Sequence, residues 1–420
     1  MRILFILSLL LPNLLVLAQT KQDLHITRIQ LEGLKRTKQS YAERFLQSAV
    51  GDSLDMAQLR KDAQQLRNLA AFANADFKLD TTPEGIGVRF QLTENLTLFP
   101  IVNFGGIKGN FWYQLGLTDA NWLGRGMQFT TYYQNNNGHN NFHFYYRIPY
   151  LGGSRWGISA NLFRWASTEP FQFPEGTAIY DFENYGIGST GMYEFQLNHS
   201  LEVGGLFFVE RHRLQSGQSF PSAPTQLEQP KVLFKIIHRF NRVNNHFFYR
   251  AGFDNITRYE TVYALHDRSW FRQLVSDTHF YKRYGKRGNL ALRLRLGIST
   301  NNNSPFAPFI LDSQFNIRGS GNRVDRGTAT ITLNTEYRQT VFESNLFAAQ
   351  LVGFSDLGTW RQPGGTLDDL VKAANFRHFA GGGIRLIYKK AWNAILRADY
   401  GIDVYNPQQG GLVLGLGQYF

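Results

Sequence analysis

Residues Leu290–Ile298 read LALRLRLGI, and this stretch shows the pattern that decides the fold. Side chains of a β-strand alternate between its two faces, so five aliphatic side chains point one way while Arg293 and Arg295 point the other. The same period of two recurs in FHFYYRI at 142–148 and in WNAILRADYGI at 392–402. We therefore expect strands with one apolar and one polar face.

From about Leu98 onward, no helical period extends over the length of a helix. A soluble sandwich would pack its apolar rows into a core, whereas a membrane barrel turns them to lipid and its polar rows to the lumen. Charge pairs within the polar rows favour the barrel, as do strands of about nine to eleven residues, the length that crosses a bilayer. We expect a transmembrane antiparallel β-barrel of about sixteen strands over residues 96–420.

The composition points the same way. Aromatic residues make up 15% of the chain, and 40 of its 420 residues are Gly, yet the mean hydropathy is negative, as expected when apolar and polar faces alternate. The 44 basic and 32 acidic residues give a net charge of +12 that is not gathered into a nucleic-acid-binding motif. We expect these cations in the lumen or at a rim, near anionic outer-membrane lipid such as lipopolysaccharide, with no nucleic-acid partner.

Residues 1–18 have the pattern of a cleaved secretory signal peptide. Arg2 precedes the apolar run Ile3–Leu17, and Ala18 completes the small-residue cleavage site. The alternative is a membrane anchor, which needs about 20 uninterrupted apolar residues. We expect export and a mature chain that begins at Gln19. The absence of Cys from the sequence excludes a disulfide framework.

Residues 24–95 differ in texture from the rest of the chain. A strand over 26–31 is followed by a helical stretch over 37–47 and a second helix over 56–69, which Ser53 or Asp55 can cap. Two strands near 72–79 and 85–92 complete a small α+β domain. The order strand, helix, helix, strand, strand resembles the polypeptide-transport-associated (POTRA) domain, which implies a periplasmic position. The matching positions are Ile29, Gly33, Gly51, Leu66, Phe72 and Glu94.

Three further segments narrow the family. They are GLTDANWLGRG at 116–126 with YRIPYL at 146–151, FNIRGS at 315–320, and Glu336 together with FSDLGTW at 354–360. Together they resemble the outer-membrane assembly factor superfamily, which includes BamA-like and TamA-like insertases and the two-partner secretion transporters. The resemblance implies a long loop held inside the barrel through Arg318 and Gly319. The family motif at the tip of this loop is Val-Arg-Gly followed by an aromatic residue. Ile317, Arg318 and Gly319 match it, whereas Ser320 stands at the aromatic position.

The resemblance pairs Arg318 with acidic side chains on the lumen wall, and Glu336 and Asp356 lie at the matching positions. Period two independently places Glu336 on one polar face with Thr330, Thr332, Asn334 and Arg338. Asp356 shares its face with the apolar Val352 and Phe354 as well as with Gln350. An Arg suits this role because its planar guanidinium can bind two carboxylates at once and stays charged. The alternative is a solvated loop Arg.

The last strand is expected to form a lateral seam with the first. Glycines weaken strands and leave packing gaps, although ordinary barrel curvature would also explain them. An aromatic last residue resembles the recognition signal of bacterial outer-membrane barrels. The seam residues are Gly411, Leu412, Leu414, Gly415, Leu416, Gly417 and Phe420.

These patterns predict an outer-membrane biogenesis factor that inserts or translocates client polypeptides through the barrel or its seam. The resemblance implies an accessory or dedicated factor, because the central insertase of the superfamily carries several POTRA domains and only one POTRA-like domain is expected here. The alternatives are a passive or selective pore and a periplasm-facing anchor for a partner protein. We expect no catalytic residue, cofactor or metal, because no nucleophile elbow, P-loop or zinc spacing occurs. His139 and His143, about 13 Å apart on one strand face, are too distant to share a metal ion.

Overall fold

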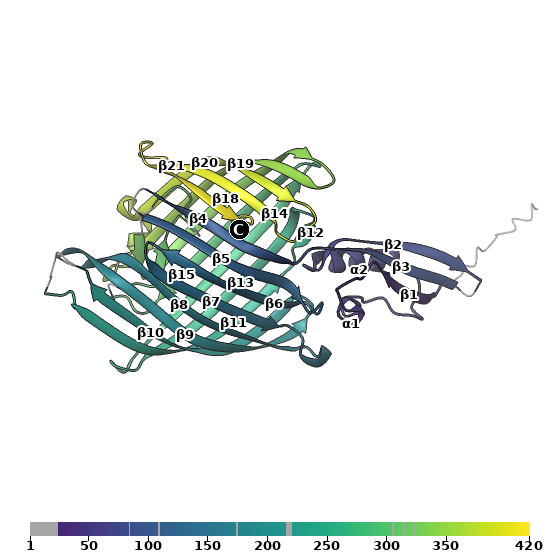
Figure 1. Ribbon diagram of the computed structural model, residues 1–420, viewed down its shortest axis with the longest axis horizontal. Helices are drawn as coiled ribbons and strands as arrows, with labels where there is room; N and C mark the ends of the chain where they lie inside the picture. Colours follow the sequence, from purple (N-terminus) through teal and green to yellow (C-terminus); the bar gives the residue numbers. More distant parts are fainter. Residues whose placement is uncertain are drawn as a thin grey trace, which may run out of the picture.

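The computed structural model describes residues 24–83, 85–107, 110–173, 175–215, 221–304, 306–313, 316–321 and 325–420. The expected signal peptide, residues 1–18, and its cleavage site lie outside the described residues. A small α+β domain adjoins one end of a large β-barrel (Figure 1). We call this end of the barrel the domain end. In the described residues, no helix is long and apolar enough to cross a membrane.

The small domain contains a three-stranded sheet and two helices. Its elements are β1 (Ile26–Glu32), α1 (Gln39–Glu43), α2 (Met56–Asn68), β2 (Phe72–Thr82) and β3 (Gly85–Glu94). The sheet order is β1-β3-β2, with β1 parallel and β2 antiparallel to β3. Asp55 caps α2 by accepting hydrogen bonds from the backbone of Ala57 (2.7 Å) and Gln58 (3.2 Å).

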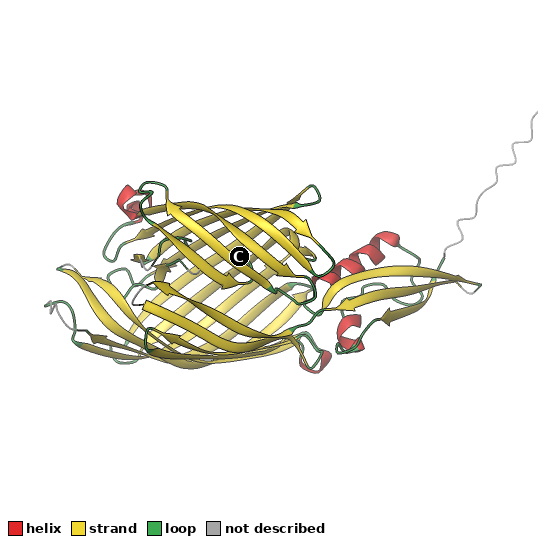
Figure 2. Ribbon diagram, turned by 45° about the horizontal axis from the view of Figure 1, so that its top comes forward, coloured by secondary structure: helices red, strands yellow, loops and turns green. Residues whose placement is uncertain are grey.

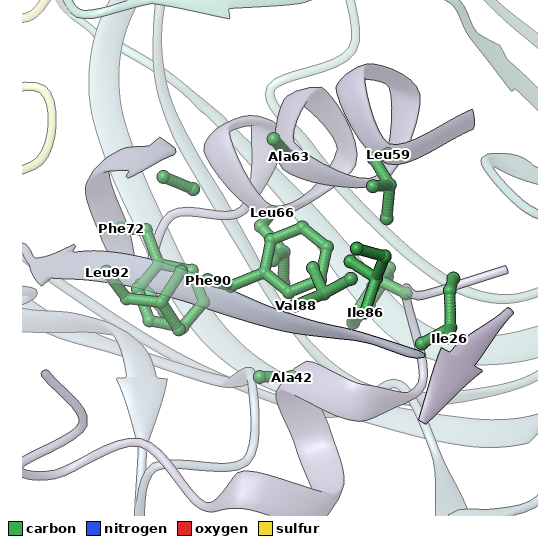
Figure 3. Close-up of a cluster of buried hydrophobic side chains, with 13 residues drawn as sticks. Ile26, Ala42, Leu59, Ala63, Leu66, Phe72, Ile86, Val88, Phe90 and Leu92 are labelled. Carbon is green, nitrogen blue, oxygen red and sulfur yellow. The ribbon is translucent and has the colours of Figure 1, made fainter. Parts of the chain in front are cut away.

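One apolar core holds this domain together. Leu59, Ala63 and Leu66 recur along one face of α2 and pack on Val88 and other side chains of the sheet (Figure 3). The core side chains labelled in Figure 3 are Ile26, Ala42, Leu59, Ala63, Leu66, Phe72, Ile86, Val88, Phe90 and Leu92.

The first helix is shorter than the 37–47 that the sequence predicts. It ends after Glu43, and the backbone N–H groups of Gln47 and Ser48 donate to the buried carboxylate of Asp62 (3.1 and 3.0 Å). A side chain from α2 therefore takes the hydrogen bonds that a continued helix would have made internally.

Residues from Leu98 onward form the closed barrel (Figure 2). Sixteen strands of the described chain form the wall, because the three-residue β12 only extends the contact between β11 and β13. The wall strands are β4 (Leu98–Ile107), β5 (Asn110–Trp122), β6 (Met127–Asn136), β7 (His139–Ile148), β8 (Trp156–Phe173), β9 (Gly176–Gln196), β10 (His199–Leu214), β11 (Gln226–Asn241), β13 (Tyr249–Ala264), β14 (Ser269–Tyr284), β15 (Gly288–Ser299), β18 (Ala329–Glu343), β19 (Phe347–Arg361), β20 (Phe376–Tyr388), β21 (Ile395–Asp403) and β22 (Gly410–Leu416), and β12 is Asn244–His246.

The outer and inner faces of the barrel follow the predicted alternation. In β15, Leu294, Leu296 and Ile298 are exposed on the outside, whereas Ala291 and Arg293 are buried on the inside. An exposed aliphatic row opposite a buried charged row is the inverse of a soluble core and suits a lipid surface. This confirms the barrel expected from the sequence.

Strand lengths and one boundary differ from expectation. The wall strands are not uniformly nine to eleven residues long, since β9 has 21 residues and β22 has seven. The last but one strand begins at Ile395 and not at Trp392. Trp392 instead donates its backbone N–H to Leu96 O (3.0 Å), outside the ladder of β21.

The long connection between β15 and β18 contains a short hairpin of β16 (Phe309–Leu311) and β17 (Asp325–Gly327). Five of the wall strands, β18 to β22, follow Arg318. Three short 3₁₀ turns lie at Leu151–Gly153, Leu367–Val371 and Ala373–Asn375.

Candidate functional site: a loop held inside the barrel beside the last strand

The connection between β15 and β18 meets the inner wall at Ile317 and Arg318. Ile317 is 1% exposed and packs in an apolar cluster with Leu311, Trp360 and Phe379. A Cβ on Gly358 would lie 2.3 Å from the Ile317 side chain, so glycine at this position of β19 makes room for the loop. The apolar cluster positions the next residue, Arg318, against the charged part of the wall.

The structure brings Arg318 together with both carboxylates that the sequence assigned to it. The backbone N–H and Nε of Arg318 each donate to Asp356 Oδ2 at 2.9 Å, and Nη2 donates to Asp356 Oδ1 at 2.9 Å. Nη1 donates to Glu336 Oε2. All three side chains are fully buried. We call the contact of Arg318 with Asp356 and Glu336 the latch.

The latch belongs to a larger buried network. Glu336 also accepts from Arg338 Nε (2.5 Å) and Arg385 Nη2 (3.1 Å). Arg385 Nη1 donates to Asp399 Oδ1 at 2.6 Å, and Asp399 Oδ2 lies 3.9 Å from Arg318 Nη1. Buried charges that share partners in this way are costly to separate, because each would be left uncompensated in a site of low polarity.

Arg385 and Asp399 are members of this network that were not predicted from the sequence. Period two places Asp399 on the polar row of 393–401, but it does not show which side chains lie opposite Asp399 across the lumen. Arg338 was placed on the lumen face of β18, but its pairing with Glu336 could not be read from the pattern.

Two glycines let the loop approach the wall. Gly319 has φ +89°, a conformation that favours glycine, and a Cβ there would lie 2.5 Å from Gly401 O. A Cβ on Gly401 would lie 2.5 Å from Arg318 O. The backbone of the loop therefore rests directly on β21 at a point where neither chain carries a side chain.

Four of the predicted seam residues lie on the two faces of β22. Leu412 and Leu414 are exposed on the outer face of β22. A Cβ on Gly411 would lie 3.1 Å from Gly319 O, and a Cβ on Gly415 would lie 2.7 Å from Arg397 Nε. These two glycines thus leave room for the loop and for a lumen guanidinium.

Gly417 and Phe420, which the sequence assigns to the seam strand, lie beyond its end. β22 stops at Leu416, and Gly417 (φ +81°) turns the chain out of the strand. Phe420 packs inside with Val243, Tyr281 and Ala291 and does not face lipid. The reason is the left-handed conformation of Gly417, which breaks the extended geometry on which period-two reasoning rests.

Segment 116–126, singled out from the sequence, contacts the small domain. Lys38 N donates to Gly124 O at 2.8 Å, and Asn121 Nδ2 donates to Thr37 Oγ1 at 3.0 Å. A Cβ on Gly124 (φ +71°) would lie 2.0 Å from Arg36 O. This glycine-rich turn between β5 and β6 is therefore shaped to fit the segment before α1.

A second contact is centred on Arg44. Its guanidinium lies 3.9 Å from the Tyr150 ring centroid, donates to Gly153 O at 2.7 Å and lies 3.8 Å from Glu194. Burial raises the pKa of Tyr41 and of Tyr150, so both phenols remain neutral. This cation–π contact joins α1 to the turns at the domain end of the barrel.

A third contact uses amide side chains of α2. Asn245 N donates to Asn68 Oδ1 at 2.9 Å, Gln64 Nε2 donates to Asn245 O at 3.1 Å, and Asn198 Nδ2 donates to Gln65 Oε1 at 3.2 Å. The small domain thus reaches from the β5–β6 turn to the turns after β9 and β11. This docking was not predicted from the sequence.

Glu94 anchors the loop that makes the first of these contacts. Its carboxylate accepts from the backbone N–H groups of Lys35 (3.1 Å), Arg36 (3.0 Å) and Thr37 (2.8 Å). Burial alone would raise the pKa of Glu94, but these hydrogen bonds outweigh it and hold the pKa below its ordinary value of 4.5.

Comparison with known proteins gives this arrangement a family. A model described as the Omp85 superfamily domain matches residues 121–420, most of the chain. The chain belongs to the Omp85 superfamily. It is thus an outer-membrane β-barrel of a family involved in protein transport and assembly, as the resemblance of its motifs implied.

Solved structures agree with the Omp85 fold. BamA from Haemophilus ducreyi, solved without POTRA domains 1–3, has a TM-score of 0.50 at 14% identity, over 94% of this chain and 83% of that one. CdiB from Acinetobacter baumannii has a TM-score of 0.57 at 12% identity, over 94% and 74% of the two chains. CdiB from Escherichia coli has 0.59 at 11%, over 94% and 76%. A search of curated proteins found no match.

Proposed function

We propose that this Omp85 barrel inserts or translocates client polypeptides at the outer membrane, with its small domain in the periplasm. The observation that carries the proposal is the weak wall beside the latch. β22 has seven residues and pairs with β21 only from Leu396 to Ile402, whereas β8 and β9 pair from Trp156 to Phe173. This pairing is among the shortest in the wall, matched by the seven register pairs of β7 with β8. Fewer ladder hydrogen bonds make this part of the wall easier to open than the long strand pairs.

The outer surface at the seam supports lateral exit. A groove of about 380 Å³ crosses it, with Val102 of β4 on one side and Leu414 and Leu416 of β22 on the other. Its lining is largely apolar, which suits a segment passing between the lumen and lipid.

The small domain supplies a place for an extended client. β2 is an edge strand of its sheet, while the start of the other edge strand, β1, is bonded to the segment 51–54. An exposed edge can accept an added strand through backbone hydrogen bonds, with little dependence on client sequence. We propose that clients first bind here.

The first experiment is depletion of the protein followed by quantitative proteomics of the outer membrane and the medium. Insertion predicts a fall in other barrels, and secretion predicts loss of a released polypeptide. Unchanged protein levels combined with altered uptake of small solutes would instead support the pore, and unchanged results in both would refute transport.

A second experiment tests the seam itself. Because the chain has no Cys, a short bis-maleimide can join Val102→Cys to Leu414→Cys without side reactions. Joining β4 to β22 should block client accumulation. The matched control is Leu292→Cys with Thr335→Cys, register partners in the continuous wall of β15 and β18. Full client accumulation with the seam joined would contradict lateral exit.

A further inference from the structure

The segment that follows β22 enters the lumen and contacts the latch. After Gly417, Gln418 Oε1 accepts from Arg385 Nε at 3.2 Å, and Phe420 O accepts from Arg338 Nη2 at 3.1 Å. Arg385 and Arg338 are the two arginines that share Glu336 with the latch. The end of the seam strand is therefore bonded to the same network that holds the loop.

Tyr419 makes the most direct connection. It is 9% exposed, and its ring centroid lies 4.4 Å from Arg318 Cζ. Its hydroxyl donates to Ser313 O at 3.4 Å, so the side chain contacts the loop at Ser313 as well as at Arg318. The Phe354 ring centroid lies 3.8 Å from the same Cζ atom.

Arg318 thus contacts two aromatic rings from different parts of the wall. Phe354 belongs to β19 in the continuous wall, whereas Tyr419 is joined to β22 at the seam. A cation over a ring face is stabilised most when water is excluded, as it is at this fully buried guanidinium. Displacing Tyr419 would remove one of the two ring contacts of Arg318.

We propose that Tyr419 is a positioning residue that couples the latch to the seam, so that the loop and the end of β22 are released together. Movement of β22 away from β4 withdraws Tyr419 from Arg318 and loosens the loop. The Tyr419 ring lies 4.4 Å from Arg318 Cζ and 4.8 Å from Arg397 Cζ. Release of Arg318 from Asp356 in turn removes the nearer of these two cations and loosens the segment after Gly417. Coupling between two sites is reciprocal, so each release promotes the other by the same factor.

The test uses the full-length protein, refolded in detergent and checked for heat-modifiable migration. Ser320→Cys reports on the loop and Gln418→Cys on the segment after β22, each as the single thiol of the chain. The rate of labelling by a soluble maleimide measures how often each position opens. No client is needed, so the result is independent of the proposed function.

Tyr419→Leu keeps an apolar side chain but removes the ring, and we expect labelling of Ser320→Cys to rise about tenfold, or ~1.4 kcal/mol. Tyr419→Phe keeps the ring and should restore the wild-type rate. Tyr405→Leu, at a tyrosine 72% exposed in the turn before β22, is the matched control and should change nothing.

The reciprocal arm is Arg318→Ala with Gln418→Cys as reporter, and the segment should label about tenfold faster. This arm decides alone if Tyr419→Leu fails to refold. The proposal is overturned if folded Tyr419→Leu leaves loop labelling unchanged, or if Arg318→Ala leaves segment labelling unchanged. Either outcome would mean that Tyr419 only supports its own segment.

Discussion

Replacing Arg318 with Ala should release the internal loop without unfolding the barrel. Arg318 has no exposed surface and makes three hydrogen bonds to Asp356 and one to Glu336. Removal of one partner from a buried charge network costs about 3–5 kcal/mol, whereas an exposed ion pair contributes about 0–1. The loop contacts lose this energy and the wall strands do not, so the open population of the loop should rise about 10²–10⁴-fold.

Limited proteolysis of the folded protein measures this change. Cleavage by a protease of broad specificity, such as proteinase K, tracks the open population when opening is fast. Trypsin is unsuitable because Arg318→Ala removes one of its sites. Cleavage within 312–326 should accelerate while heat-modifiable migration is retained. Equal cleavage rates in the wild type and Arg318→Ala would show that Arg318 does not hold the loop.

Companion variants distinguish the two carboxylates. Asp356→Asn weakens the partner that takes most Arg318 contacts and should mimic Arg318→Ala. Glu336→Gln removes the anion shared with Arg338 and Arg385 and should also destabilise the wall. Arg318→Lys should rescue only partly, since an ammonium cannot bind both carboxylates with the same planar geometry. The sequence predicted the reverse, namely that Glu336→Gln would resemble Arg318→Ala more closely than Asp356→Asn does.

Three other changes test separate parts of the structure. Gly319→Ala should loosen the loop by about 1–3 kcal/mol, because φ is positive and its Cβ would meet Gly401 O, whereas Gly321→Ala has open space and a smaller effect; proteolysis of the loop compares them. Glu94 has a lowered pKa, so its contribution to stability is complete above about pH 4.5 and is lost as the pH falls through the folded value. Protease sensitivity of the small domain should therefore rise on acidification, and Glu94→Gln should show this sensitivity at neutral pH; a wild-type response in the variant would contradict the assignment. Gly124→Ala should undock the small domain, measured as faster cleavage near residues 95–98, and an unchanged rate would show that this turn does not set the docking.

The alternating sequence was enough to predict the barrel and the faces of its strands. Period two is a local property of extended backbone, so the outward aliphatic row of β15 and the inward position of Glu336 follow from residue order alone. The same rule failed at Trp392 and Phe420, where a tertiary backbone contact and a left-handed glycine interrupt the strand. Period two also could not predict strand length, because the length depends on how far two paired strands continue beyond the membrane.

The site was only partly visible in the sequence. The resemblance to a family motif predicted the contact of Arg318 with Glu336 and Asp356. Arg385 and Asp399 lie on other strands. Period two predicts which way these two side chains point, but not which side chains lie opposite them. The docking of the small domain was hidden for the same reason, since Arg36 reaches Asp119 across 83 residues of chain.

The sequence by itself therefore determined the two faces of the strands, the presence of a second helix after Ser53 or Asp55, and which arginine lies in the loop. Only the tertiary structure decided that Arg318, Arg338 and Arg385 surround three carboxylates, and that Tyr419 turns inward to cover Arg318. The physical reason is that local periodicity fixes the direction of a side chain from its own backbone. The distance between side chains on separate strands depends on barrel closure, strand register and loop path, which are properties of the whole folded chain.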